Sequence, residues 1–341
     1  MDKDIVTLAH GSGGEMGHAL VRSIVDIFDD PILDELEDAA LVPFDEQEGH
    51  CAGRIVFTTD SYVVRPLFFP GGDIGKLAVC GTINDLAMRG AVPLYLSAGF
   101  ILEEGLPLAD LKRIVASMGE VAHEAGVRIV TGDTKVVERG SADKMFLNTA
   151  GVGVVPPGVQ ISASSARPGD AILLSGAVGD HGLAIMTQRE GLRFESSLRS
   201  DCAPLHTLVQ AMLEASPHIH TLRDPTRGGL ATTLNELAGQ SGVGIRIEET
   251  SIPIHEPVRA ASELLGLDPL YVANEGKLVA IVEAKDAQDV LRAMRAHPQG
   301  REAAIIGEVV DEHAGRVAMC TILGTHRLLD MLASEQLPRI C

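Results

Sequence analysis

The stretch at 71–90 places the tightest limits on what this chain can fold into. From Ile74 to Arg89, apolar residues recur at the spacing of a helix that buries one face. Asp73 stands where an N-cap is expected, and Gly90 stands where such a helix ends. Asp85 lies late in the pattern, where aspartate has poor helix propensity and no helix end to cap. We therefore expect a packed helix that carries Asp85 for a functional reason.

Strand-like and helix-like patterns alternate along the rest of the chain, which at 341 residues is long enough for two domains. Strands are expected at 36–42, 54–64, 93–101, 148–155, 171–174, 244–247, 278–282 and 304–309, and a buried one at 127–130 running on into 131–136. Helices are expected at 16–28, 107–125, 230–238 and 286–296, after Gly182, and around 328–332. We predict an α+β fold of two domains, each a mixed β-sheet with helices on one face.

A Pro- and Gly-rich stretch at 156–170 is the expected seam between the two domains. The predicted divisions are an N-terminal Gly-rich loop and helix at 1–35, an N-terminal domain at 36–158, a C-terminal domain at 159–323 and a mobile tail at 324–341.

The tail carries a thiol, Cys341, at its last position. Pro338 stiffens the approach to it, and Ile340 supplies an apolar side chain to bury, so this segment is suited to docking as well as to moving. From the tail alone, a terminal cysteine without a function is the favoured interpretation, and the rest of the chain has to decide between the two.

Charge and composition exclude several classes of function. A net charge of -19 argues against binding nucleic acid, which requires clustered Lys and Arg, and favours a cation-dependent site or a basic partner protein. The five cysteines are odd in number and irregularly spaced, which indicates reduced thiols in a cytoplasmic protein. We expect no signal peptide and no membrane span, because the sequence contains neither pattern.

Four aspartates stand beside turns or at the ends of apolar segments: Asp38, Asp60, Asp85 and Asp224. A single aspartate in such a place is usually a solvated cap. Hard divalent cations, however, are held by carboxylates from separate segments, with substrate phosphates completing the coordination shell. The four residues are therefore candidate ligands for Mg²⁺.

The glycine-rich stretch at 10–14, followed by a helical pattern, is a candidate phosphate lid or simply a flexible segment. A P-loop is excluded at 71–77, because the spacing between glycines and lysine is wrong and Leu77 replaces the metal-binding hydroxyl. A dinucleotide-binding glycine fingerprint after a strand is also absent from the sequence. Any nucleotide chemistry therefore belongs to another fold.

Several segments in order along the chain resemble the ATP-binding superfamily of aminoimidazole ribonucleotide synthetase, thiamine monophosphate kinase and selenophosphate synthetase. They are Glu37-Asp38-Ala39-Ala40, Thr59-Asp60, Asn84-Asp85-Leu86-Ala87-Met88-Arg89-Gly90-Ala91, Gly132-Asp133-Thr134 and Asp224-Pro225-Thr226-Arg227-Gly228-Gly229. Within that superfamily, 10–14, Gly132-Asp133-Thr134-Lys135-Val136 and the terminal Pro338-Arg339-Ile340-Cys341 resemble the HypE family of hydrogenase maturation factors. The resemblance spans nearly the whole chain.

The resemblance implies a specific reaction. HypE proteins carry a carbamoyl group on the C-terminal cysteine and dehydrate it with ATP to a thiocyanate, the source of cyanide for the nickel-iron hydrogenase centre. The ATP- and Mg²⁺-binding residues implied are Asp38, Asp60, Asp85 and Asp224, with Gly132, Asp133, Thr134 and Lys135 also at the ATP, and Gly11, Ser12, Gly13 and Gly14 as further candidates. Catalytic roles are implied for Cys341, Lys135 and Glu275. A cytoplasmic homodimer is implied, with HypF as carbamoyl donor and a HypC–HypD complex as cyanide acceptor.

From the residues alone, other interpretations stay open. Lys135 could pair with surface acids, and Glu275 could cap a turn. The chain could also be a superfamily member that phosphorylates a free small molecule, or a nucleotide-binding scaffold that only presents Cys341 to a partner. Dependence of ATP turnover on Cys341 separates these readings.

Overall fold

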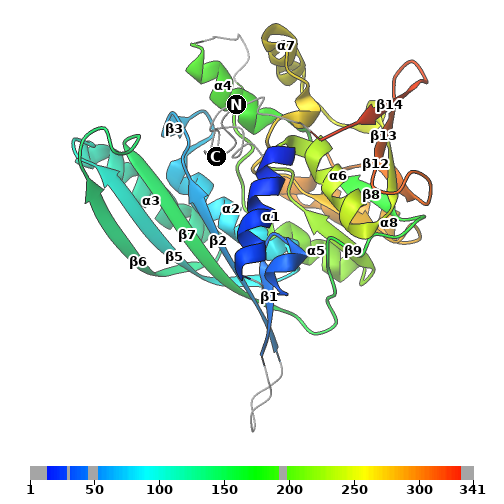
Figure 1. Ribbon diagram of the computed structural model, residues 1–341, viewed down its shortest axis with the longest axis horizontal. Coiled ribbons are helices and arrows are strands. Elements are labelled where there is room, and N and C mark those ends of the chain that lie inside the picture. Colours follow the sequence, from blue (N-terminus) through cyan, green and yellow to red (C-terminus); the bar gives the residue numbers. More distant parts are fainter. Residues whose placement is uncertain (1–13, 29–30, 45–52, 192–197, 332–341) are drawn as a thin grey trace.

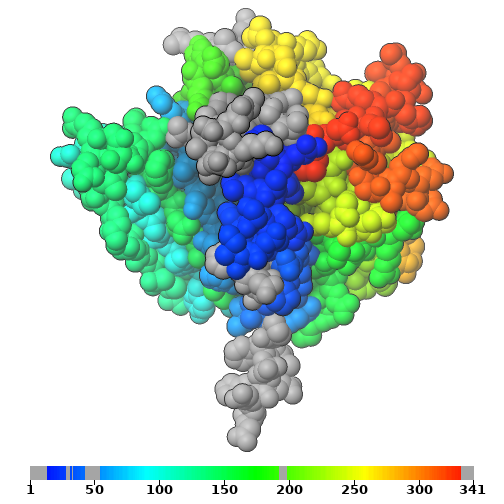
Figure 2. Space-filling view, in the orientation of Figure 1, coloured from blue at the N-terminus to red at the C-terminus, as the bar shows by residue number. Residues whose placement is uncertain are grey.

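The computed structural model describes residues 14–28, 31–44, 53–191 and 198–331, which form two sheet-containing domains side by side (Figure 1). The terminal Cys341 and the loop residues Gly11, Ser12 and Gly13 lie outside the described residues. Helix α1 (Glu15–Phe28) lies across the front of the molecule between the two sheets (Figures 1 and 2). None of the described helices is long and apolar enough to cross a membrane.

The N-terminal domain is built on a five-stranded mixed sheet in the order β1-β2-β7-β5-β6. Its strands are β1 (Ala40–Phe44), β2 (Gly53–Tyr62), β5 (Val92–Glu103), β6 (Arg128–Val137) and β7 (Met145–Val155). All neighbours are antiparallel except β5 and β6, which are joined through helix α3 (Leu108–Glu124). A short ribbon of β3 (Phe68–Phe69) and β4 (Gly72–Asp73) leads into helix α2 (Ile74–Met88).

The C-terminal domain contains a seven-stranded mixed sheet in the order β14-β13-β10-β12-β8-β11-β9. Its strands are β8 (Ala171–Leu174), β9 (Ile219–Arg223), β10 (Gly244–Glu248), β11 (Val279–Val282), β12 (Ala304–Val310), β13 (Val317–Cys320) and β14 (His326–Leu329). Its helices are α4 (Asp180–Arg189), α5 (His206–Ala215), α6 (Gly229–Ser241), α7 (Glu256–Leu265) and α8 (Ala287–Ala296). Short 3-10 turns stand at Leu33–Glu35, Glu249–Ser251, Pro269–Tyr271 and Pro298–Gly300.

Alternate residues of strand β8 show how the C-terminal sheet is covered. Ile172 and Leu174 pack in one apolar cluster with α6, whereas Leu173 packs in another with α5 and α8. The predicted α+β fold of two domains with mixed sheets is confirmed. The expectation that helices lie on one face of each sheet is wrong for this domain, where helices cover both faces because the sheet is buried between them.

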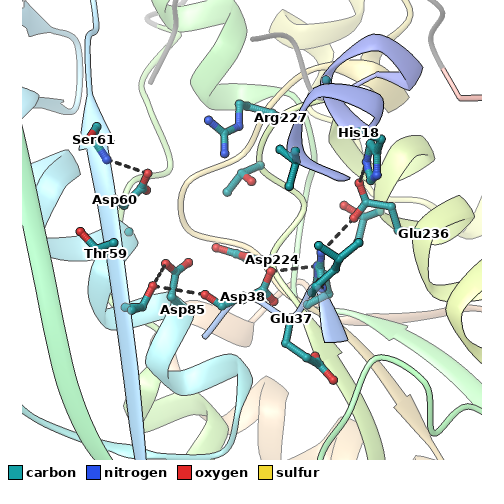
Figure 3. A pocket seen from close by; sticks show the side chains of 18 of the residues that line it. His18, Glu37, Asp38, Thr59, Asp60, Ser61, Asp85, Asp224, Arg227 and Glu236 are labelled. Atoms are coloured by element: carbon teal, nitrogen blue, oxygen red, sulfur yellow. Dashed lines mark hydrogen bonds and ion pairs between the residues drawn. The ribbon is translucent and has the colours of Figure 1, made fainter. Parts of the chain in front are cut away.

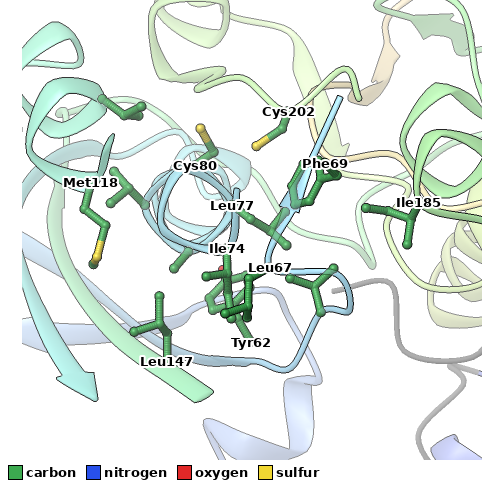
Figure 4. Packing of buried hydrophobic residues seen from close by; sticks show 14 of the residues in the cluster. Tyr62, Leu67, Phe69, Ile74, Leu77, Cys80, Met118, Leu147, Ile185 and Cys202 are labelled. Atoms are coloured by element: carbon green, nitrogen blue, oxygen red, sulfur yellow. The ribbon is translucent and has the colours of Figure 1, made fainter. Parts of the chain in front are cut away.

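Helix α2 is the centre of the molecule. Asp73 caps it as predicted, accepting from the backbone N–H groups of Gly75 (2.8 Å) and Lys76 (3.0 Å). The helix buries nearly every residue rather than one face, because it packs against its own sheet and α3 on one side and against α5 on the other. Figure 4 shows Met118 of α3 and Leu147 of β7 beside the helix. Gly81 allows α2 to pack closely against the end of β2, because a Cβ at this position would stand 2.2 Å from the hydroxyl of Tyr62.

Two further predictions from the sequence are wrong. The run at 127–130 was expected to be a buried strand, but β6 is exposed along nearly its whole length because it is the edge strand of the sheet. The pattern around 328–332 was expected to be helical, but β14 (His326–Leu329) is a strand that pairs with β13, which supplies the hydrogen bonds that so short a helix would lack. Conversely, α5, α7, β9 and β13 lie where no element had been predicted.

Candidate functional site

A cavity of about 400 Å³ opens where the two domains meet, beneath α1 (Figure 3). The N-terminal domain lines it with the segment before β1, the end of β2 and one side of α2, and the C-terminal domain lines it with the turn after β9, α6 and the turn before β11. Five of the predicted site residues line it together: Asp38, Asp60, Asp85, Asp224 and Glu275. Segments far apart in the sequence thus bring five carboxyl groups to one space.

Asp38 is held by an ion pair from the C-terminal domain. Its Oδ1 lies 2.9 Å from Nε of Arg223, at the end of β9. Its Oδ2 is buried and has no hydrogen-bond partner among the described residues. Burial raises the pKa of Asp38 well above its usual value, although Arg223 opposes the shift. A buried carboxylate oxygen without a partner is costly unless a ligand or cation completes it.

Asp85 faces the cavity from α2, where Thr58 of β2 donates a hydrogen bond of 2.8 Å to its Oδ2. Burial raises the pKa of Asp85 well above its usual value, and the negative charges of Asp224 and Asp60 add to the shift. Burial likewise raises the pKa of Asp224 to about 6. These groups repel one another when ionised, so a cation between them would be strongly favoured.

Asp60 stands on β2 on the N-terminal side of the cavity (Figure 3). Its Oδ1 accepts from the backbone N–H of Ser61 at 2.8 Å, and its carbonyl accepts from the side-chain amide of Asn148 at 2.9 Å. Glu275 approaches from the opposite domain and is 4% exposed. Burial, followed by the charges of Asp224 and Asp201, raises the pKa of Glu275 well above its usual value, which would make it a stronger base once ionised.

The remaining predicted residues are elsewhere. Gly132, Asp133, Thr134 and Lys135 lie on the exposed edge strand β6 and do not line the cavity. The Nζ of Lys135 is 2.5 Å from Oδ2 of Asp133, and both side chains are 69% exposed. Gly14 stands at the start of α1. Within one chain, the structure therefore does not bring Lys135 to the carboxylates.

The cavity also contains residues that the sequence analysis missed. Arg223 pairs with Glu236 of α6 (3.1 Å) as well as with Asp38, and Glu236 in turn bonds the ring of His18 on α1 (2.7 Å). The spacing of Thr233, Glu236 and Gln240 along α6 could have indicated this wall, because residues three and four positions apart share one face of a helix.

Glu37 also lines the cavity, but its carboxyl points away from the aspartates (Figure 3). It lies 2.5 Å from Arg89 and accepts from Ser162 at 2.6 Å, so its charge is already paired.

Carboxylate oxygens are the ligands that Mg²⁺ prefers, and the unpartnered Oδ2 of Asp38 fits such an ion. The aspartates do not form a ready-made cage. Among the described residues, the one set of three side chains whose ligand atoms lie within 4.8 Å of one another is His218, Glu283 and Asp286, in the C-terminal domain away from the cavity. A divalent ion in the cavity would therefore share its coordination shell with phosphate oxygens of a substrate.

Comparison with known proteins places the chain in a family. Residues 36–155 match the N-terminal domain of AIR synthase related proteins, and residues 167–320 match their C-terminal domain. The carbamoyl dehydratase HypE of Azotobacter vinelandii is 60% identical over 98% of this chain and 97% of its own length. HypE of Escherichia coli K12 is 49% identical over 98% of this chain and 99% of its own length.

Solved structures agree. A HypE–HypF complex superposes with a TM-score of 0.86 at 50% identity, covering 92% of this chain and 99% of that one. A hydrogenase maturation protein HypE in complex with ATP gives a TM-score of 0.82 at 53% identity, covering 98% of this chain and 100% of that one. With both domain models and near-complete relatives in agreement, the chain belongs to the HypE family of carbamoyl dehydratases.

Proposed function

We propose that this enzyme uses ATP to dehydrate a carbamoyl group carried on its own Cys341, giving a thiocyanate that supplies cyanide to the nickel-iron hydrogenase centre. The observation that carries the proposal is the convergence of Asp38, Asp60, Asp85, Asp224 and Glu275 on one cavity between the domains. A relative that is 53% identical is known in complex with ATP, which supports nucleotide binding at such a site.

Asp38, Asp60, Asp85 and Asp224 would hold Mg²⁺ together with the ATP phosphates. The ion would offset the negative charge of the phosphates during transfer. Asp38 and Asp85 are suited to this because Arg223 and Thr58 fix one oxygen of each carboxyl group. The aspartates are thus held in place before the nucleotide arrives.

The chemistry balances without another reactant. The carbamoyl oxygen of Cys341–S–C(=O)NH₂ attacks the γ-phosphorus of ATP, and ADP leaves. The carbon–oxygen bond then breaks, phosphate departs with that oxygen, and the nitrogen loses both protons, leaving Cys341–S–C≡N. Glu275 would accept a proton from the nitrogen, and its position in the cavity wall and its raised pKa support this role.

Lys135 would need a second copy of the chain to take part in this chemistry, because it lies on the exposed strand β6 away from the cavity of its own chain. Strand β6 exposes Val130 (52%) and Val136 (70%), and the neighbouring β5 exposes Tyr95 (43%) and Ile101 (43%). An open apolar edge of this kind is normally covered. We propose a homodimer through this sheet, in which Lys135 of each copy serves the cavity of the other and offsets charge on the transferred phosphate.

Delivery of the carbamoyl group by HypF and passage of the cyanide to a HypC–HypD complex complete the proposal, in the cytoplasm. The HypE–HypF complex solved for a 50% identical relative supports the first of these contacts. Placing the reactive thiol on a terminal arm would allow it to visit a donor, its own ATP site and an acceptor in turn.

Intact-protein mass spectrometry of the carbamoylated enzyme tests the proposal. Addition of ATP and Mg²⁺ should remove the mass of one water, and Cys341→Ala should show neither the carbamoyl adduct nor the loss. Dehydration that persists in Cys341→Ala would refute it. ATP turnover that requires an added metabolite and ignores Cys341 would instead identify a small-molecule kinase. ATP binding without hydrolysis by the carbamoylated chain would identify a scaffold.

A further inference from the structure

The backbone turn that carries Glu275 is held from two directions by Asn84 and Asp201, which do not line the cavity. The turn precedes β11, and its neighbour Gly276 packs directly on the carbonyl of Asp201. A Cβ on Gly276 would stand 1.9 Å from that oxygen. The backbone at Gly276 therefore cannot move toward the segment at 200–205, and a side chain at this position is excluded.

Asp201 binds the turn from one direction. Its Oδ1 accepts from the backbone N–H of Glu275 (3.1 Å), and its Oδ2 accepts from the backbone N–H of Gly276 (3.3 Å). The Nζ of Lys277 lies 3.1 Å from the same Oδ2. The Asp201 side chain is only 4% exposed, and the charge of Lys277 helps to keep its pKa below the usual value despite burial. One buried carboxylate thus fixes three consecutive residues.

Asn84 binds the same turn from the other domain. Its Nδ2 donates to the carbonyls of Glu275 (3.3 Å) and Ala203 (3.2 Å), and its Oδ1 accepts from the backbone N–H of Leu205 (2.8 Å). The side chain is 1% exposed, so these bonds have no competition from bulk water. Cys202, in the same segment, faces Cys80 one helical turn before Asn84 on α2 (Figure 4).

The position of Asn84 in the sequence gives these bonds a functional meaning. It is the residue before Asp85 on the buried helix α2, and adjacent helical positions point in different directions. Asp85 therefore faces the cavity while Asn84 reaches into the C-terminal domain. One rigid helix thus connects a carboxylate of the proposed phosphate site with the backbone of the proposed base.

We propose that Asn84 and Asp201 are positioning residues that set the place of Glu275 relative to Asp85 across the domain boundary. This inference rests on the proposed role of Glu275 as a base. Neither residue lines the cavity, so neither touches substrate. Their loss should displace the base while leaving the four aspartates in place, so the proton-transfer step should slow and ATP binding should not.

The test compares Asn84→Ala with Asn235→Ala. Asn235 is a matched control, because it is also a buried asparagine whose amide donates to two backbone carbonyls, those of Ala231 and Leu329 (both 2.8 Å), and it does not line the cavity. For Asn84→Ala, thiocyanate formation in single turnover should fall about 10- to 100-fold, the cost of a displaced catalytic group. The ATP dissociation constant should change by less than about threefold, a difference too small to indicate a lost phosphate contact.

Asn235→Ala should lower the melting temperature to a similar extent and leave the rate unchanged. An equal loss of rate in both variants, or a loss of ATP affinity in Asn84→Ala as large as its loss of rate, would overturn the inference. Asp201→Asn, which keeps the shape and one acceptor, provides a second variant if Asn84→Ala does not fold, and the same separation of rate from affinity is expected.

Amide hydrogen exchange gives a readout that does not depend on activity. In Asn84→Ala and Asp201→Asn, a peptide covering 274–278 should exchange faster than in the wild type, while peptides of β8 should not. If the wild type showed no dehydration, the proposed function would fail while the exchange result still tested the bonds. If dehydration occurred and exchange at 274–278 were unchanged in both variants, the positioning role alone would be wrong.

Discussion

Residues of the cavity wall and of strand β6 were assigned to one site from the sequence, but they differ in their exposure to solvent. Asp38, Asp85, Asp224 and Glu275 are enclosed between two domains, and burial raises the pKa of each. Lys135 and Asp133, by contrast, stand on an open edge, where they pair with each other and are 69% exposed. Within one chain, the cavity therefore brings together the predicted acidic residues but not Lys135.

The difference shows a limit of sequence motifs. Motifs that occur in the order known for a family indicate which residues form a site, but they do not tell whether the site is built from one copy of the chain or, as in some homodimers, from two. Burial of the carboxylates in the cavity costs free energy, because they are desolvated in the absence of a ligand. The residues of β6 are not desolvated in this way, because they are exposed to water in one chain.

The largest effect is expected for Asp85→Asn. Turnover should fall about 100-fold or more, as is usual when a preorganised electrostatic contact is removed. Stability should rise, because at neutral pH the amide replaces a buried group that burial disfavours in its ionised form. The measurements are single-turnover kinetics and the melting temperature at pH 7. Asp133→Asn on β6 is the control, and its melting temperature should not rise. Full activity in Asp85→Asn would break the comparison.

Subunit mixing tests whether Lys135 acts between chains. Lys135→Met and Glu275→Gln should each be inactive alone. After random subunit exchange, about a quarter of the wild-type sites should regain function, because half of the dimers are mixed and each mixed dimer has one intact site. Turnover of the equimolar mixture measures this. If the mixture stayed inactive although mixed dimers formed, both residues would belong to the same chain's site.

The apolar edge gives a smaller and separable effect. Val130→Glu places a charge on β6, where the side chain is 52% exposed in one chain. Burying this unpaired charge in a subunit interface would destabilise the dimer, so we expect Val130→Glu to be a monomer with little turnover. Light scattering coupled to size-exclusion chromatography measures the mass. A Val130→Glu dimer as tight as the wild type would remove β6 from the interface.

The smallest effect concerns His18, which ties α1 to the cavity wall. The hydrogen bond to Glu236 raises the pKa of His18 above its usual value of 6.5. A raised pKa in the folded state means that the stabilisation is fully present below about pH 6.5 and is lost as the pH rises through the raised value. His18→Gln should therefore lower the melting temperature at pH 6 but hardly at pH 9. The substitution should change the free energy of unfolding at pH 6 by less than about 1 kcal/mol, because the His18 ring is 40% exposed. A pH-independent difference would contradict the ion pair.

Much of the fold followed from local patterns. Helix α2, with its Asp73 cap, was predicted because capping and periodicity act within a few residues. The convergence of Asp38, Asp60, Asp85 and Asp224 was implied by the resemblance and agrees with the cavity.

The missing parts depend on contacts between distant segments. Arg223 forms ion pairs with Asp38 and Glu236, and these pairs join three segments from both domains. The spacing of these residues in the sequence does not predict such pairs. The run at 127–130 was expected to be buried because three of its four residues are apolar, but the edge position of β6 leaves this strand exposed in one chain. The segment at His326–Leu329 is too short for its periodicity to decide, so its pairing with β13 determines its structure.

In the proposed reaction, the carbamoyl oxygen on Cys341 leaves as part of inorganic phosphate. Carbamoylated enzyme labelled with heavy oxygen at the carbamoyl group, incubated with unlabelled ATP for one turnover, tests it directly by mass spectrometry of the released inorganic phosphate. Each released phosphate should contain one heavy oxygen, and Cys341 should carry a thiocyanate. Unlabelled phosphate, with the heavy oxygen in water or still on the protein, would contradict it.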